Sequence, residues 1–188
     1  MKENIKLGLI LLLITGFAGL LLGGSYEITK GPIAEKVLAA KQSAMKELLP
    51  SADKFDKVDI EDNEKVSEVN VALSSSETIG YTIKVSPKGY GGAIETMVGI
   101  STEGKVTGIK ILSHVETPSL GANAPKPEFS DQYKSKSIKD KLEVVKIAPS
   151  KENQIQALTG ATITSAAVTL GVNDAIDFYN SSLKGAEK

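Results

Sequence analysis

A charge-free run near the amino terminus constrains this chain more than any other feature. The stretch LGLILLLITGFAGLLLGGSY, residues 7–26, contains no charged side chain. A helix of about 20 such residues spans the roughly 30 Å hydrocarbon core of a bilayer. The sequence therefore predicts a single transmembrane anchor over residues 1–26, followed by a folded domain outside the hydrocarbon.

A cleaved secretory signal is the competing interpretation, because Lys2 and Lys6 form a basic start. The apolar run is longer than the usual ~7–15-residue core of a signal peptide, and no A-x-A-like cleavage site follows it. The segment LLGGS ends in Ser25, where a lipoprotein would need a cysteine. A membrane anchor is favoured, but lysines on both sides of the run leave its orientation undecided.

Composition removes several classes of function. All 22 basic residues are lysines and the net charge is −1, so the chain lacks the arginine fork that contacts phosphates and guanine edges bidentately. Cysteine is absent and His114 is the only histidine, which excludes thiolate metal sites, iron–sulfur ligation and a His-rich metal cluster. One histidine without a serine elbow argues against a hydrolytic triad. We expect no nucleic-acid partner, no metal site and no catalytic residues.

Residues 27–65 are predicted to form an amphipathic helix and a polar linker. Pro32 suits the first turn of a helix, and Pro50 ends it. The apolar positions between them share one stripe: Ile33, Val37, Ala40, Ala44 and Leu48. The following stretch SADKFDKVDIEDNEK mixes acids with lysines and lacks the turn glycine of a calcium loop, so a solvated linker is expected.

From residue 66 to 188 the pattern indicates an α+β domain. The segments VSEVNVAL, IGYTIKVS, GAIETMVGI and KVTGIKILS are short, rich in β-branched residues and separated by turns such as PKGYGG and TEG. Such successive hairpins predict an antiparallel sheet. PEFSDQYKS is predicted to form a short helix and LEVVKIAP another strand. The terminal segment from residue 162 to 183 is predicted to be a long helix, with one apolar face: Val168, Val172, Ile176 and Tyr179.

The start of that helix carries an unusual cluster of hydroxyl groups in the segment LTGATITSAAV, residues 158–168. The first N–H groups of a helix lack internal partners and attract anions. Gly160 permits a close approach, Ala161 adds little bulk, and three nearby hydroxyls can donate to phosphate oxygens: those of Thr159, Thr164 and Ser165. Thr159 or Thr162 could equally be a simple helix cap. Spacing alone leaves both interpretations open.

Three motifs resemble a known family. TGATITS is similar to the flavinylation motif of proteins that carry FMN joined to a threonine by a phosphoester. GYGGAIETMVGI, residues 89–100, and HVETPSLG, residues 114–121, resemble two further segments of the FMN-binding domain found in the G subunits of Rnf electron-transport complexes. The C subunits of sodium-translocating NADH:quinone reductases share this domain but usually have a longer insert. The resemblance covers nearly the whole chain, including the anchor.

The resemblance assigns a cofactor site. It implies FMN bound covalently through Thr162, with the phosphate near Thr159, Gly160, Ala161, Thr164 and Ser165. It implies a flavin wall built from four residues of ETPSLG: Glu116, Thr117, Pro118 and Leu120. Tyr90 is a candidate for stacking on the ring. The chain departs from the family pattern at Gln156, where an aspartate is frequent, and at Ser119, where a glycine is frequent.

The resemblance also implies a function. The chain would be a flavinylated electron carrier in a membrane complex that couples ferredoxin:NAD electron transfer to movement of Na⁺ or H⁺, with its domain on the extracytoplasmic side. Its partners would be other membrane subunits, including a second flavinylated subunit and iron–sulfur subunits, and a flavin transferase for maturation. Two alternatives stay open. One is a stand-alone anchored FMN protein or a quinone-reductase-type subunit, and the other is a non-redox interaction module.

Overall fold

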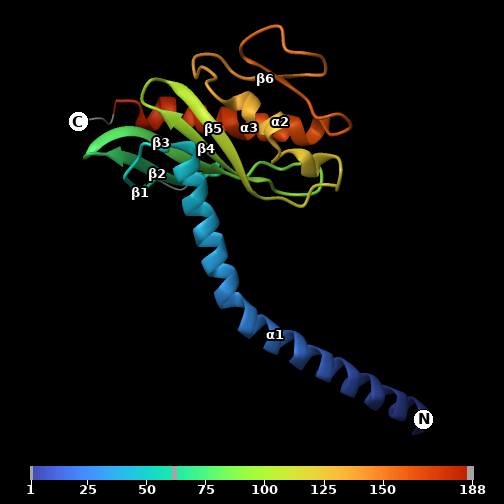
Figure 1. Cartoon of the computed structure of the whole chain (residues 1–188). Helices are drawn as coiled ribbons and strands as arrows, with labels where there is room; N and C mark the ends of the chain where they lie inside the picture. The colour runs from blue at the N-terminus through green and yellow to red at the C-terminus, as the bar shows by residue number, and fades with distance from the viewer. Residues whose placement is uncertain (1, 61–62, 186–188) are drawn as a thin grey trace. The chain divides into compact units, whose positions relative to one another are not determined.

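The computed structural model describes residues 2–60 and 63–185 (Figure 1). Contacts between residues divide the chain into two units, one ending at Lys41 and the other beginning at Gln42. The first unit consists of most of helix α1, Lys2–Leu48. The second unit contains a mixed α+β fold, as the sequence predicts, and begins ahead of the boundary predicted at residue 66.

Helix α1 runs without interruption through Pro32. The prediction that a second helix starts at this proline is therefore wrong. Proline inside a helix removes one backbone hydrogen bond, but good helix formers such as alanine, leucine and lysine follow it and sustain the helix. The predicted stop before Pro50 is confirmed, because α1 ends at Leu48. The helix is long and apolar enough to cross a membrane, and its apolar run is exposed in the structure.

Five strands form an antiparallel sheet in sequential order (Figure 1). They are β1 (Lys54–Val58), β2 (Val66–Ser74), β3 (Glu77–Val85), β4 (Glu95–Ser101) and β5 (Lys105–Ser113). The last four strands confirm the hairpin prediction. Short turns over residues 75–76 and 102–104 join β2 to β3 and β4 to β5, and a longer connection over residues 86–94 joins β3 to β4. Each connection contains glycine, serine or proline, which favour chain reversal.

Strand β1 corrects the prediction of a solvated linker. It pairs with β2 from Lys54 opposite Leu73 to Val58 opposite Val69. Its composition, KFDKV, is mostly polar because it lies at the edge of the sheet, where one row of backbone groups and most side chains meet water. Phe55 and Val58 supply its contacts with the apolar clusters on the sheet. Two apolar residues among two lysines and an aspartate give a weak strand signal.

Both faces of the sheet are covered. Helix α3, Thr162–Phe178, continues as the π-helical turn η3, Tyr179–Leu183, and packs on one face. The predicted apolar face is confirmed, since Val168, Val172, Ile176 and Tyr179 are all buried in the main core. Neighbouring residues on a strand point to opposite faces. Val98 accordingly joins the α3 core, while Met97 packs against the end of α1 at Ala44, Met45 and Leu48.

The segment between β5 and α3 contains short elements. These are η1 (Gly121–Asn123), α2 (Pro127–Ser130), η2 (Asp131–Tyr133), β6 (Glu143–Val145) and β7 (Gln154–Gln156). The short helix and the extra strand match the sequence prediction, and β6 pairs with β7 in parallel.

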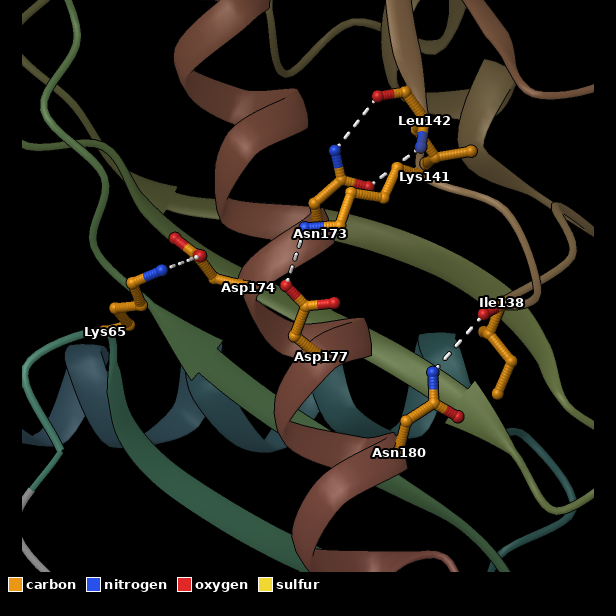
Figure 2. Close-up of polar contacts among 8 residues, drawn as sticks. All are labelled: Lys65, Ile138, Lys141, Leu142, Asn173, Asp174, Asp177 and Asn180. Atoms are coloured by element: carbon orange, nitrogen blue, oxygen red, sulfur yellow. Dashed lines mark hydrogen bonds and ion pairs between the residues drawn. The ribbon is translucent and has the colours of Figure 1, made fainter.

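Polar side chains of α3 and η3 hold part of this segment (Figure 2). The Asn173 amide clamps one backbone residue, because its Oδ1 accepts the Leu142 N–H and its Nδ2 donates to the Leu142 carbonyl, both at 2.9 Å. Asn180 donates to the Ile138 carbonyl at 3.3 Å. The Asp174 carboxylate pairs with Lys65 at 2.8 Å, which raises the pKa of that lysine. All of these contacts come from the second half of α3 and from η3, so the amino-terminal end of α3 takes no part in them.

Candidate functional site

Three separate segments enclose a cavity of about 510 Å³ at the amino-terminal end of α3. They are the turn between β3 and β4, the loop after β5, and the first turn of α3 with the residues before it. The lining residues are Tyr90, Glu116, Thr117, Leu120, Gly121, Gly160, Ala161, Thr162, Ile163 and Thr164. The three motifs that carried the family resemblance therefore meet at one place.

The start of α3 has no side-chain cap. Its N-cap residue is Ala161, and no side chain accepts a hydrogen bond there. Gly160 precedes it in the left-handed region, with φ +75°, which glycine adopts at little cost. The first helix-type bond runs from the Ser165 N–H to the Ala161 carbonyl at 3.0 Å. The amides of the three residues between them, 162–164, have no partner inside the helix.

Thr162 is the first residue of the helix and is exposed. It lines the cavity together with Ile163, whose side chain is also exposed. Neither Thr159 nor Thr162 caps the helix, so the simple capping hypothesis does not describe this structure. An exposed hydroxyl and free backbone donors lie together where the helix dipole is positive.

Two of the predicted phosphate donors are engaged elsewhere. The Ser165 hydroxyl is buried, donates to the Ala161 carbonyl and accepts the Leu158 N–H, each at 2.9 Å. The Thr164 hydroxyl is buried and donates to Oε2 of Glu116. These groups shape the helix start, and in this structure they are not turned toward an incoming phosphate.

Glu116 joins the three segments of the cavity. Its carboxylate, only 6% exposed, accepts the Thr164 hydroxyl through Oε2 and the Gly91 N–H through Oε1 at 2.8 Å. Its own N–H donates to Nδ1 of His114 at 3.3 Å. No basic side chain is among the residues that line the cavity. The carboxylate is therefore held by neutral donors from the turn and from the helix.

Glycines make room for this carboxylate. A Cβ on Gly121 would lie 2.5 Å from Oε2 of Glu116 and 2.5 Å from the Thr164 hydroxyl. A Cβ on Gly89 would lie 2.5 Å from Oε1, and one on Gly91 would collide with the Val115 carbonyl. The glycine-rich turn GYGG thus follows from the need to bring backbone against a buried acid.

The structure brings together most of the residues that the resemblance assigned. Eight line the cavity: Tyr90, Glu116, Thr117, Leu120, Gly160, Ala161, Thr162 and Thr164. Thr159 and Pro118 are exposed and do not line it. Ser119 has φ +63°, so it occupies the left-handed conformation that a glycine would adopt more easily.

Sequence reasoning missed two lining residues, Gly121 and Ile163. Gly121 could have been predicted, because it is the last residue of the ETPSLG segment. Ile163 interrupts a run of hydroxyl residues, and an apolar side chain exposed at a helix start is a signal for a ligand surface. Tyr90, 70% exposed, and Leu120, 41% exposed, give the cavity rim the same apolar character.

The cavity suits FMN in size and lining. Cofactor pockets usually enclose about 300–1,000 Å³ with mainly apolar walls and a few polar groups. Tyr90, Leu120 and Ile163 offer apolar surface for a flat ring, while Glu116 and Thr117 offer polar contacts. The open helix start offers backbone donors to a phosphate. The residues present fit both ends of the cofactor.

Comparison with known proteins gives consistent matches. The sequence pattern of the FMN-binding domain matches residues 89–177. The G subunit of the Na(+)-translocating ferredoxin:NAD(+) oxidoreductase complex of Acetobacterium woodii is 41% identical over 97% of this chain and 95% of its own length. The G subunit of the proton-translocating ferredoxin:NAD(+) oxidoreductase complex of Clostridium ljungdahlii is 44% identical over 88% and 86%, respectively.

A solved structure supports the fold. The crystal structure of the C subunit of the Na(+)-translocating NADH-quinone reductase from Parabacteroides distasonis aligns with a TM-score of 0.56. The alignment covers 71% of this chain and 77% of that chain, at 21% sequence identity. The architecture described above is thus shared with a protein whose sequence has diverged widely.

Proposed function

Since this chain belongs to the family of G subunits of ion-translocating ferredoxin:NAD(+) oxidoreductase complexes, we propose that it is the flavin-bearing electron carrier of such a complex. FMN would be attached covalently through a phosphoester to Thr162. Bound FMN supplies one- and two-electron transfer. The chain itself supplies the membrane anchor, the pocket and the attachment atom.

One observation carries this proposal. The exposed Thr162 hydroxyl lies at an uncapped helix start that opens into an apolar-lined cavity. A phosphodiester keeps a negative charge, and the positive end of α3 stabilises that charge without a lysine or arginine. A threonine that served only the helix would be expected at the N-cap, which is Ala161 here.

Formation of the ester needs an activated flavin donor, because FMN alone has no leaving group on its phosphate. A flavin dinucleotide provides one. The Thr162 oxygen–phosphorus bond forms as the pyrophosphate bond breaks, a nucleoside monophosphate leaves, and the hydroxyl proton passes to a base. We assign that base to a separate flavin transferase, since Glu116, the acid in the cavity, is buried and held in place by hydrogen bonds from Gly91 and Thr164.

Other subunits must handle the substrates. The chain has no cysteine for iron–sulfur clusters and no dinucleotide-binding fingerprint. Partners of this electron carrier would therefore include iron–sulfur subunits and a second flavinylated subunit. A stand-alone anchored FMN protein is the second candidate. It is favoured only by the fact that this chain supplies all the lining residues of the cavity described above.

Isolation of the chain from its native membranes tests this function. We expect the intact mass of the denatured chain to include one FMN. We also expect further membrane subunits to copurify with the chain in a constant ratio. Flavin attachment without partners would favour the stand-alone carrier. A chain without covalent flavin would contradict the proposal and leave a non-redox module.

From the resemblance to the G subunits, we also propose that residues after about Tyr26 lie outside the cytoplasm, with the helix of about 20 residues crossing the bilayer once. A reporter enzyme that is active only in the cytoplasm, fused after Lys188, should stay silent. The same reporter fused before Lys2 is the control and should be active. The reverse pattern would place the flavin domain inside the cell.

A further inference from the structure

The segment that carries Thr162 is tied to the rest of the domain at two adjacent residues of η2. We call residues 156–165 the attachment segment. Gln132 binds its first residue, Gln156, and Tyr133 connects to its last residue, Ser165, through Thr169. Neither Gln132 nor Tyr133 lines the cavity.

Gln132 clamps the entry of the attachment segment. Its Oε1 accepts the Gln156 N–H at 2.7 Å and its Nε2 donates to the Gln156 carbonyl at 3.2 Å. On the other edge of this backbone, the next residue, Ala157, donates to the Val145 carbonyl of β6 at 2.8 Å. The Gln132 amide therefore occupies the free edge of β7 in the way that a neighbouring strand would.

Tyr133 supports the exit of the segment. It is fully buried, and its ring packs edge-on against Phe129 with centroids 5.6 Å apart. Its hydroxyl lies 2.7 Å from the Thr169 hydroxyl, which donates to the Ser165 carbonyl at 2.9 Å. Because the Thr169 proton is used there, Tyr133 is the donor to Thr169. Burial raises the pKa of Tyr133 well above its usual value, which keeps that donor protonated.

Ser165 connects the first turn of α3 to the residues that precede the helix. Its hydroxyl donates to the Ala161 carbonyl and accepts the Leu158 N–H, both at 2.9 Å. Tyr133 thus reaches the Ser165 carbonyl through Thr169, and the hydroxyl of the same serine binds residues on either side of Gly160. The Ser165 hydroxyl, which the sequence offered as a phosphate ligand, belongs instead to this support.

We propose that Gln132 and Tyr133 are positioning residues for flavin attachment. Together they fix the entry and the exit of the attachment segment, so that the Thr162 hydroxyl is presented to the flavin transferase in one geometry. The effect on flavin attachment rests on the proposed function. The hydrogen bonds that hold the attachment segment, however, are present in the chain without flavin. Misplacement of a reacting group by a small distance lowers the rate of a positioned reaction strongly.

The test uses the full-length chain in detergent, made without flavin transferase. The variants are Gln132→Ala, which removes the entry clamp, and Tyr133→Phe, which keeps the ring and removes the donor. The control is Asn173→Ala, because Asn173 clamps Leu142 through the same pair of backbone bonds outside the attachment segment (Figure 2). All three lose hydrogen bonds, but only the first two lose support of the segment.

Amide hydrogen exchange is the first measurement. Peptides covering residues 156–165 should exchange about tenfold faster in Gln132→Ala and measurably faster in Tyr133→Phe, since each loses bonds that hold the segment. Asn173→Ala should leave these peptides protected. Equal exchange in the three variants would overturn the proposal whether or not flavin is ever attached.

The second measurement is the initial rate of flavin transfer, with purified transferase and a flavin dinucleotide. We expect kcat/KM to fall by about tenfold in Gln132→Ala and severalfold in Tyr133→Phe, and to stay near the wild-type value in Asn173→Ala. If kcat/KM falls in proportion to the fall in melting temperature in all three variants, including Asn173→Ala, the two residues only stabilise the fold and the proposal is overturned. A wild-type chain that accepts no flavin would contradict the proposed function, and the exchange data would still decide this inference.

Discussion

Thr162→Ala is expected to abolish covalent flavin attachment completely while leaving the domain folded. The substitution removes the oxygen that forms the ester. It removes no hydrogen bond that the structure contains among the described residues, because Thr162 is exposed and the helix is not capped by its side chain. Exposed substitutions of this kind change the free energy of unfolding by about 0.5 kcal/mol or less.

The measurement is the intact mass of denatured chain that was produced together with a flavin transferase. Wild-type chain should carry one FMN on the tryptic peptide from Glu152 to Lys184, and Thr162→Ala should carry none. Thr162→Asp should also carry none, although aspartate is a good residue at a helix start. Thr159→Ala is the matched control, since Thr159 is exposed three residues earlier, and it should keep the flavin. Flavin found on Thr159, or retained by Thr162→Ala, would refute the assignment.

Much of this fold follows from local patterns in the sequence. The alternating segments predicted β2 to β5, and the apolar period of the last helix placed Val168 and Val172 in the core. Proline predicted the end of α1 correctly and its interior wrongly, because Pro32 lies between segments that both favour helix. Strand β1 escaped prediction because an edge strand needs few apolar residues.

The site was predictable in outline, but its hydrogen bonds were not. The motifs identified which residues gather around the cavity, but they did not show which hydroxyls stay free. The Thr164 hydroxyl is bound by Glu116, a residue 48 positions earlier, and the clamp on Gln156 comes from Gln132, 24 positions earlier. Long-range partners of this kind depend on how the loops fold over the sheet, which a pattern within one segment does not encode.

Glu116→Ala is expected to have the second large effect, on stability and on the pocket together. The substitution removes the acceptor of the buried Thr164 hydroxyl and of the Gly91 N–H, whose hydrogen bond is partly buried. Hydrogen bonds to a charged group contribute about 1.5–3 kcal/mol each, so we expect the free energy of unfolding to fall by about 3 kcal/mol or more. The turn that carries Tyr90 and the start of α3 would also lose the link between them.

Glu116→Gln separates the two roles of the side chain. A glutamine has the same shape, its carbonyl can accept the Gly91 N–H, and its amide can donate to the Thr164 oxygen. We expect it to lose about 1 kcal/mol or less and to keep the flavin attached. In the proposed site the carboxylate would lie near the ring and oppose the negative charge gained on reduction, so its removal should raise the flavin midpoint potential. A change of about 1.4 kcal/mol corresponds to roughly 59 mV for one electron, and a shift of several tens of millivolts is expected.

Denaturant unfolding of the chain without flavin and redox titration of the flavinylated chain measure these effects separately. Gly121→Ala provides a control for the pocket, since its added Cβ would collide with Glu116 and Thr164 without removing any charge. It should lower stability but change the potential less than Glu116→Gln does. If Glu116→Gln titrates like wild type while Glu116→Ala is unstable, Glu116 only assembles the pocket. If both variants match wild type in stability and in potential, the buried carboxylate that joins the three motifs has neither role.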